Sequence, residues 1–320
     1  MKSSKVQLAT WPSPLDPMPR LSASLGLLPT DLWIKRDDLS GLGGGGNKLR
    51  KLEYTCAAAL EQGAKALVTV GAAQSNHARL TAAAGARLGM EVVLFLNGTP
   101  PVDATGNIAL DSLLGAKIIW TGDVDGQLLS EKAQDYARSL SKKGKTAAFI
   151  PFGGSNATAA LGYVDCGSEL MAQAPNLCHI VTAVGSGGTM AGLVHALGAN
   201  RVLGIDTGAV SDPDASVRNL VSALAGKPTN DTLRIRRDQI GTGYGELTKP
   251  VKEALQLVAR TEGIILDPVY TGRAFAGLMA AVREGTIKPG EQVVFLHSGG
   301  LPGFFGHSDA RNFSNIDSPS

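Results

Sequence analysis

Residues 66–89 read ALVTVGAAQSNHARLTAAAGARLG, and this stretch decides the fold. It begins with a short apolar, partly β-branched run, Ala66 to Val70, which is typical of a buried strand. The turn GAAQSNH follows, and a helix of small residues is predicted from Ala78 to Leu88. A strand that leads through a turn into a helix is the repeating unit of a parallel sheet.

The same unit recurs on both sides of this stretch. Before it, the sequence predicts a strand at Asp31 to Arg36, a flexible glycine run at Gly41 to Gly46 and a helix from Asn47 to Gly63. After it, further strands are predicted at 91–96, 116–120, 146–150, 179–184, 202–205 and 293–297. Further helices are predicted at 108–114, 128–142, up to about 172, at 190–197, at about 250–260 and after 271. Residues 212–239 show less regular patterning. The alternation predicts an α/β protein with two doubly wound open-sheet domains.

Composition indicates a globular protein with a small-molecule partner. The 320 residues are 43% hydrophobic and 18% charged, enough for one large core or two smaller ones. The net charge is +2 with acids and bases interleaved, so we expect neither nucleic acid nor membrane as a partner. The first twenty residues lack the apolar run of a secretory signal, and no window is apolar enough to span a bilayer.

Neither the cysteines nor the histidines predict a metal site. The three cysteines, and His179, His195 and His307, have no metal-ligand spacing. A reducing compartment accommodates unpaired cysteines as small buried residues, so we expect a cytoplasmic location.

A glycine-rich loop, GSGGT, follows the predicted strand 179–184 and precedes a helix. Backbone N–H groups at such a helix start bind anions, and Gly185, Gly187 and Gly188 let the backbone approach a phosphate. Ser186 and Thr189 add hydroxyl groups. A dinucleotide is the alternative ligand, since Asp206 ends the next strand. However, Met190 stands where that fingerprint requires glycine, which makes this alternative the weaker one.

Lys48 lies between a glycine run and a predicted helix. An amine at that edge of a sheet can form a Schiff base if it is partly desolvated. The plain alternative is a solvated lysine beside Arg50 and Lys51. A Walker-type phosphate loop is excluded, because Leu49 stands where that motif requires serine or threonine.

Six motifs, in this order, resemble those of the D-cysteine desulfhydrase and 1-aminocyclopropane-1-carboxylate (ACC) deaminase family. The similarity runs from about residue 10 to residue 307. The motifs are GGGNKLRKLEY (44–54), GAAQSNHARLTAAAGARLG (71–89), TGNIALDSLLGA (105–116), IPFGGSNATAALGY (150–163), ILDPVYTGRAFAGL (265–278) and FLHSGG (295–300).

This resemblance implies the tryptophan-synthase-β-like fold (fold type II) of enzymes that use pyridoxal 5′-phosphate (PLP). In that fold a smaller domain, here 52–161, is inserted into a larger one, here 1–51 and 162–320, and the cofactor lies between them. It also implies a homodimer.

The resemblance further implies roles for individual residues. For the cofactor these are Lys48 on the aldehyde, Lys51 and the loop Gly185, Ser186, Gly187, Gly188 and Thr189 on the phosphate, Asn76 on the ring hydroxyl, and Thr271 and Ser298 near the ring nitrogen. For the substrate these are Gln74, Ser75 and His77 around the carboxylate, with Tyr244 and Tyr270 lining the substrate side of the ring.

Plain structural roles stand beside these assignments. Ser75 suits a helix cap, His77 suits a satisfied polar residue, and Tyr244 and Tyr270 suit half-buried aromatics. We do not expect a nucleophilic pair of Ser75 and His77, because no acidic partner is identifiable.

Two positions favour one reaction within the family. The ACC deaminase branch has glutamate and leucine where this sequence has Thr271 and Ser298, as the desulfhydrase branch does. A neutral hydroxyl holds a ring nitrogen protonated less firmly than a carboxylate does. We therefore expect β-elimination, in which freed Lys48 is the general base, with D-cysteine as first substrate, L-cysteate second and ACC third. Ala73 and the segment Gly98–Asp103 differ from the residues that are most common in the family. These differences bear on which substrate the enzyme uses.

Overall fold

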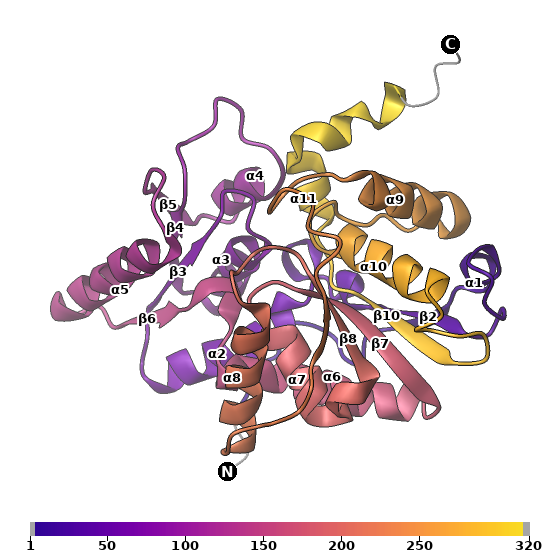
Figure 1. Ribbon diagram of the computed structural model, residues 1–320. Helices are drawn as coiled ribbons and strands as arrows, with labels where there is room; N and C mark the ends of the chain where they lie inside the picture. The colour runs from indigo at the N-terminus through magenta and orange to yellow at the C-terminus, as the bar shows by residue number, and fades with distance from the viewer. Residues whose placement is uncertain (1–3, 316–320) are drawn as a thin grey trace.

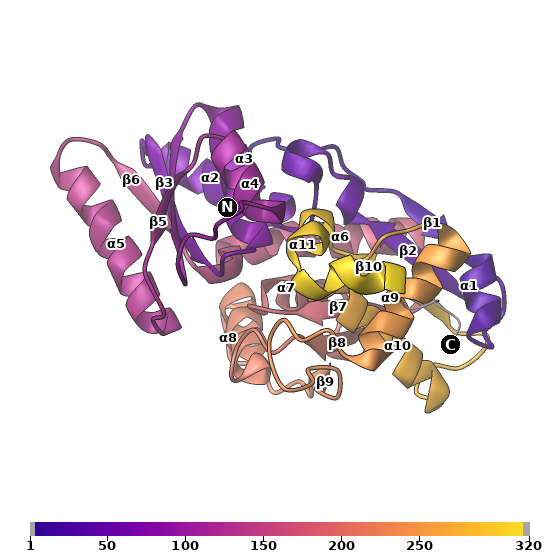
Figure 2. The same ribbon diagram turned by 90° about the horizontal axis from the view of Figure 1, so that it is seen from above.

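Two β-sheets, each packed against helices, form the core of the computed structural model, which describes residues 4–315 (Figures 1 and 2). Within those residues the larger sheet has the strand order β1-β2-β10-β7-β8-β9 and the smaller has β5-β4-β3-β6. All neighbouring strands are parallel except β1 and β2. The larger sheet contains β1 (Leu15–Pro17), β2 (Leu32–Arg36), β7 (Leu177–Val184), β8 (Val202–Asp206), β9 (Arg234–Arg236) and β10 (Gln292–His297). The smaller contains β3 (Ala66–Gly71), β4 (Glu91–Leu96), β5 (Lys117–Trp120) and β6 (Ala147–Ile150).

Helices connect most of these strands, because neighbouring parallel strands need a crossover connection. They are α1 (Pro19–Ser24), α2 (Lys48–Glu61), α3 (Asn76–Leu88), α4 (Gly106–Leu113), α5 (Gly126–Lys142), α6 (Ala157–Gln173), α7 (Gly188–Leu197), α8 (Pro213–Ala225), α9 (Lys249–Glu262), α10 (Thr271–Arg283) and α11 (Leu301–Gly306). Short 3₁₀ segments lie at Asp37–Leu39, Leu42–Gly44, Phe152–Gly154, Ala199–Arg201 and Ser308–Asn315. No helix of the described residues combines the length and apolar character that crossing a membrane takes.

The larger sheet is buried on both faces. Along β10, Val293 and Phe295 pack into a core with α1, α9 and α10. The alternate residues Val294 and Leu296 pack into a second core with α6, α7 and α8. This alternation follows from the pleat of a strand, and two covered faces make the sheet doubly wound, as the sequence predicts.

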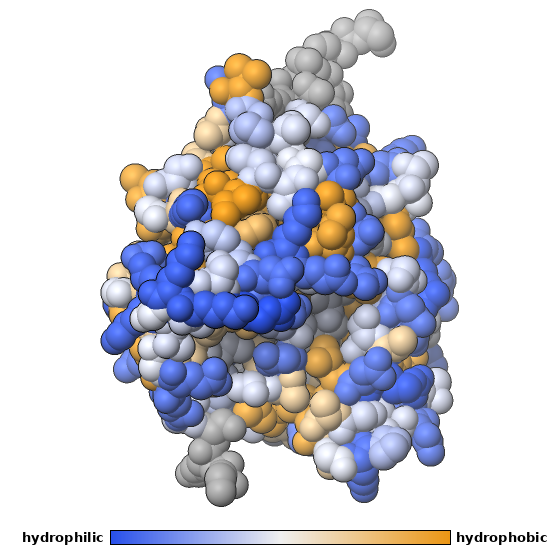
Figure 3. Space-filling view, turned by 90° about the vertical axis from the view of Figure 1, so that its left-hand side faces the viewer, coloured by the Kyte–Doolittle hydropathy of each residue, from blue (hydrophilic) through white to orange (hydrophobic). Residues whose placement is uncertain are grey.

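The smaller sheet is built in the same way. Leu67 of β3 packs with α2 and α3, whereas Val68 and Val70 pack against α5. The outer side of α5 is exposed and polar, and a hydrophilic band crosses the face that carries this helix (Figure 3). The fold class predicted from the sequence is therefore confirmed.

Helix α2 joins the two sheets. Leu49, Leu52 and Cys56 pack into the core of the smaller sheet, as their spacing predicts, whereas Leu60 lies 39% exposed, against that prediction. On the opposite side of α2, the Arg50 guanidinium points toward the larger sheet.

Arg50 binds two carboxylates there. Its Nε lies 2.8 Å from Asp37 Oδ2, and its Nη1 lies 2.8 Å from Glu169 Oε1 of α6. The Tyr163 hydroxyl donates to Asp37 Oδ2 at 2.6 Å. These buried bonds fix the start of α2 against the end of β2.

Most predicted elements are found within two residues of their expected ends, but some were missed. The less regular segment 212–239 contains α8 and β9, and the proline-rich start contains β1 and α1. Helix α11, which follows the last predicted strand, was missed as well, and all three missed helices have proline in their first turn.

Candidate active site

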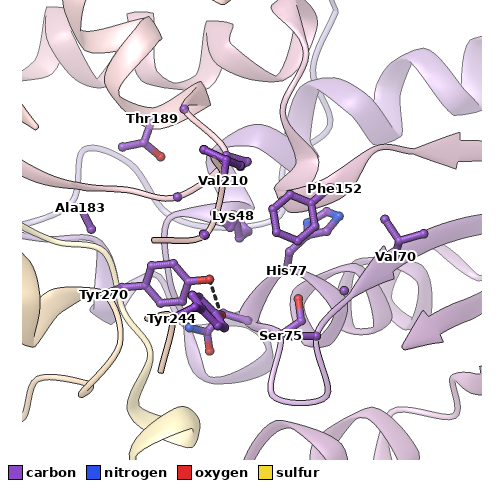
Figure 4. A pocket seen from close by; sticks show the side chains of 18 of the residues that line it. Lys48, Val70, Ser75, His77, Phe152, Ala183, Thr189, Val210, Tyr244 and Tyr270 are labelled. Carbon is purple, nitrogen blue, oxygen red and sulfur yellow. Dashed lines mark hydrogen bonds between the residues drawn. The ribbon is translucent and has the colours of Figure 1, made fainter. Parts of the chain in front are cut away.

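A cavity of about 480 Å³ lies between the two sheets, mostly where strands end. Segments that follow β3, β4, β6, β7, β8 and β10 all contribute to its wall, together with the first turn of α2. Ligands of parallel α/β sheets bind at such carboxyl ends. The wall includes Lys48, Lys51, Ser75, Asn76, His77, Gly185, Ser186, Gly187, Thr189, Tyr244, Tyr270 and Ser298, so the cavity gathers twelve of the residues singled out above (Figure 4).

Two lysines from one face of α2 enter this cavity. Burial lowers the pKa of the half-buried Lys48 to about 8, although its hydrogen bond with Lys51 acts in the opposite direction. Burial and the charge of Lys48 hold the pKa of Lys51 well below its usual range. Lys51 Nζ donates to Gly153 O at 3.1 Å and to Ser155 Oγ at 2.9 Å. An amine of lowered pKa is a nucleophile near neutral pH.

The glycine-rich loop brings the start of α7 next to Lys51. Gly187 has a φ of +88°, a conformation that favours glycine. A Cβ on Gly188 would lie 3.0 Å from Lys51 Nζ and 2.7 Å from Ser155 Oγ. The backbone of the helix start and the lysine amine therefore converge, which is the arrangement that binds an anion.

Two residues with no predicted role complete this region. Ser155 Oγ accepts the bond from Lys51 and lies 2.7 Å from Ser186 Oγ. Asn47 Nδ2 donates to Thr189 Oγ1 at 3.0 Å. Both side chains lie within motifs quoted above, but only the folded chain brings them to the loop.

The turn before α3 forms the opposite wall. Ser75 caps the helix, since its Oγ accepts from Ala78 N at 3.1 Å. His77 is buried, and its Nε2 lies 2.9 Å from Thr69 Oγ1. Because the Thr69 hydroxyl donates to Ile150 O, we assign the proton to His77 Nε2. Burial holds the pKa of His77 well below its usual value, so the ring is neutral.

Tyr244 and Tyr270 form a hydrogen-bonded pair. Their hydroxyl oxygens are 2.8 Å apart, and their rings meet edge to face (Figure 4). Burial and the neighbouring Tyr244 raise the pKa of Tyr270 well above its usual value, so its hydroxyl keeps its proton. Tyr270 is oriented by Asp267, whose Oδ2 accepts from Tyr270 N at 2.8 Å.

Three predicted site residues do not line the cavity. Both the oxygen and the nitrogen of the Gln74 amide form hydrogen bonds with main-chain atoms at the start of α4. The Thr271 hydroxyl donates to Asp267 Oδ1 and accepts from Asp267 N, each at 2.7 Å. Gly188 is not among the residues of the wall, although its loop neighbours Gly187 and Thr189 are. Of the two positions expected near a ring nitrogen, only Ser298 lies in the cavity wall.

The cavity suits a phosphorylated aldehyde. No aspartate or glutamate occurs among the described residues of its wall, whereas two lysines and a helix start do. A phosphate group fits the anion-binding end, and an aldehyde fits an amine of lowered pKa. A cavity with these residues is the kind of site that enzymes use to bind PLP.

Comparison with known proteins supports that class. The sequence matches the family described as pyridoxal-phosphate dependent enzymes over residues 6–299, and the chain belongs to this class. The cofactor is therefore PLP, and the dinucleotide that the sequence left as an alternative is ruled out.

The chain belongs, within that class, to the ACC deaminase family. A protein of Pyrococcus furiosus named "Putative 1-aminocyclopropane-1-carboxylate deaminase" is 37% identical over 96% of this chain and 95% of its own. A Pyrococcus abyssi protein of the same name is 39% identical over 95% and 94%. A crystal structure described as an "ACC deaminase homologue" superposes with a TM-score of 0.89 at 37% identity, over 96% and 95% of the two chains. Threonine deaminase isoform 2 of Solanum lycopersicum shares the fold, with a TM-score of 0.62 at 21% identity over 90% and 79%.

Proposed function

We propose that this enzyme is a β-eliminating, deaminating lyase that converts D-cysteine to pyruvate, hydrogen sulfide and ammonia. The observation that carries the proposal is that Ser298 occurs in the cavity wall, whereas no carboxylate does among the described residues. A ring nitrogen beside a hydroxyl is protonated less firmly than one beside a carboxylate. Loss of a good β leaving group tolerates this, whereas opening of a cyclopropane ring requires a stronger electron sink.

The family resemblance implies the proposed cofactor contacts, and the positions of these residues in the wall support them. Lys48 would hold the aldehyde carbon, and Lys51 with the loop Gly185–Thr189 would hold the phosphate. Asn76 would face the ring hydroxyl. PLP, when bound, supplies the electron sink for breaking bonds at the substrate α-carbon.

The remaining chemistry belongs to side chains of the wall. The start of α3 at Ser75 binds the substrate carboxylate through backbone N–H groups. The Lys48 amine, with its lowered pKa, takes the α-proton. The C–S bond then breaks, and the sulfur leaves with the electron pair. Tyr270, which keeps its proton, donates a hydrogen bond to the departing sulfur. The released 2-aminoacrylate then takes up water and yields pyruvate and ammonia.

Two other substrates are weighed against D-cysteine. L-cysteate would lose sulfite in the same kind of elimination. ACC would give 2-oxobutyrate and ammonia, and the names of the relatives favour it.

A substrate panel tests the proposal. The purified PLP-loaded enzyme is offered D- and L-cysteine, D- and L-cysteate and ACC, and pyruvate, 2-oxobutyrate, sulfide, sulfite and ammonia are measured. We expect equal amounts of sulfide, pyruvate and ammonia from D-cysteine, and no turnover by Lys48→Ala. Sulfite from cysteate alone would move the assignment to a sulfo-lyase. Turnover of ACC alone would refute the argument from Ser298.

We extend the proposal to the organisation of the protein. The inserted domain comprises 52–161, which contains the whole smaller sheet, and the larger domain comprises 1–51 and 162–320. The enzyme acts as a cytoplasmic homodimer. Analytical ultracentrifugation measures the oligomeric state.

A further inference from the structure

We propose that Asn107 is a positioning residue for the cofactor, because it determines which end of the Asn76 amide faces the cavity. Asn107 is the second residue of α4 and is 0% exposed. This inference rests on the proposed placement of the ring hydroxyl beside Asn76.

The Asn107 side chain has only one possible orientation. Its Nδ2 donates to the backbone carbonyl of Gln74 at 2.9 Å and to Asn76 Oδ1 at 2.9 Å. A backbone carbonyl only accepts hydrogen bonds, so the atom bound to Gln74 O must be the amide nitrogen. Asn107 Oδ1 is buried and has no hydrogen-bond partner among the described residues, so the contacts of this side chain depend on Nδ2.

This orientation is passed on to Asn76. The second hydrogen of Asn107 Nδ2 points to Asn76, so the Asn76 amide must turn its oxygen toward Asn107. Its nitrogen is then the end left to donate to a ligand, and Asn76 lines the cavity. An ionised ring hydroxyl accepts such a bond. Without Asn107, the nearly symmetric amide of Asn76 has less reason to prefer that orientation.

The backbone of Asn107 also fixes the turn that carries Asn76. Asn107 N donates to Gln74 Oε1 at 2.8 Å, and Gln74 Nε2 donates to Thr105 O at 3.0 Å. The Gln74 side chain thus links the turn before α3 to the start of α4.

Glycines close over this cluster. A Cβ on Gly106 would lie 2.6 Å from Gln74 Oε1, and one on Gly306 of α11 would lie 2.3 Å from the same atom. A Cβ on Gly303 would lie 3.9 Å from both Asn107 Nδ2 and Asn76 Oδ1. The amides are therefore enclosed between α4 and α11, with little room for a different arrangement.

Asn107→Asp tests the inference, because it replaces the donor by an acceptor of the same shape. The Asn76 amide is then expected to rotate, which turns its oxygen toward the cavity. A hydrogen bond to an anionic oxygen favours the deprotonated form of the bound cofactor. Its loss should raise the pH of the absorbance transition of bound PLP by about one unit and weaken PLP binding roughly tenfold. Asn107→Ala, which keeps the backbone bond to Gln74, is a second variant with the same expected direction.

A double-variant cycle separates a positioning role from a structural one. Asn76→Ala should shift the transition by a similar amount, and adding Asn107→Ala should shift it no further. Asn156→Ala is the matched control, since Asn156 Oδ1 caps α6 by accepting from Ala159 N at 2.8 Å. It should lower thermal stability and leave the transition unchanged.

Two outcomes would overturn the inference, and they differ in what else they affect. If Asn76→Ala shifts the transition and both Asn107 variants keep the parent spectrum and PLP affinity, Asn107 is only structural. If Asn76→Ala also leaves the spectrum unchanged, the placement of the cofactor is wrong as well. The substrate panel tests the elimination reaction separately from either outcome.

Discussion

At the scale of single residues, Lys48 differs from a surface lysine because its amine is half-buried at the mouth of two sheets. Burial lowers its pKa to about 8, so a substantial neutral fraction exists at that pH. Only the neutral amine attacks an aldehyde. We therefore expect the rate of PLP capture by the cofactor-free enzyme to rise with pH and to level off above about 8.

Stopped-flow absorbance between about pH 6 and pH 10 measures this rate. Free Nα-acetyl-lysine is the control, and its rate should still rise toward its own pKa of about 10.4. An enzyme profile that follows that of the free amino acid would show that the cavity does not activate Lys48.

The sequence identifies the residues of the cavity wall better than the residues that support them. Lys48, Ser75 and Tyr270 stand in quoted motifs, and all three meet at the cavity as expected. Ser155 and Asn107 stand in motifs too, but their partners lie at least 31 positions away. Which side chain supports which depends on how the sheets and helices pack, and neither motif spacing nor residue type specifies that.

At the scale of secondary-structure elements, Arg273 of α10 holds the loop that carries Tyr244. Its guanidinium donates to Thr207 O, to Gly243 O at 2.8 Å and to Glu246 O at 2.9 Å, and the side chain is 0% exposed. Lysine cannot reproduce this fork of donors.

We expect Arg273→Lys to lower the free energy of unfolding by about 2 kcal/mol. Amide hydrogen exchange should increase at residues 243–246, and KM should rise more than kcat falls. Urea denaturation and exchange mass spectrometry measure these effects. Arg283→Lys, at the exposed end of the same helix, should change neither quantity. Unchanged exchange at 243–246 in Arg273→Lys would mean that the loop keeps its position without the fork.

Helices and strands with a clear pattern of hydrophobic residues were predictable from the sequence. Helices and strands without such a pattern were not. Strand β4 was found at its predicted residues, because EVVLFL is apolar and β-branched. Helix α8 was missed, although Asp212 caps it and Pro213 starts it. Its buried residues are few, so the apolar stripe that signals a helix is weak.

At the scale of the whole molecule, the buried contacts of Arg50 hold the two sheets together through α2. Burial alone would raise the pKa of Asp37, but the charge of Arg50 and its hydrogen bond hold that pKa below its usual value. A carboxyl whose pKa is lower in the folded state stabilises the fold fully above its unfolded pKa of about 4. That contribution is lost as the pH falls through the folded pKa.

Asp37→Asn should therefore cost about 3 kcal/mol of unfolding free energy at pH 7, because Arg50 keeps a buried charge without the more deeply buried of its two carboxylate partners. The difference from the parent should shrink below about pH 4. Urea denaturation at several pH values tests both points. Asp135→Asn, which removes an exposed pair with Arg138, should change stability by less than about 0.5 kcal/mol. If Asp37→Asn lowers the free energy of unfolding as little as the control does, this ion pair does not stabilise the fold.

The placement of the cavity between two sheets has a consequence for the evolution of the gene. Lys48, Lys51 and the GSGGT loop are encoded outside the stretch Ala66–Ile150, whereas Ser75 and Asn76 are encoded inside it. Under the proposed roles, most contacts to the cofactor are encoded outside this stretch, whereas the contact to the substrate carboxylate is encoded inside it. Recombination that exchanges the inner part between related genes would then change the substrate specificity of the enzyme and leave most of its cofactor-binding residues unchanged.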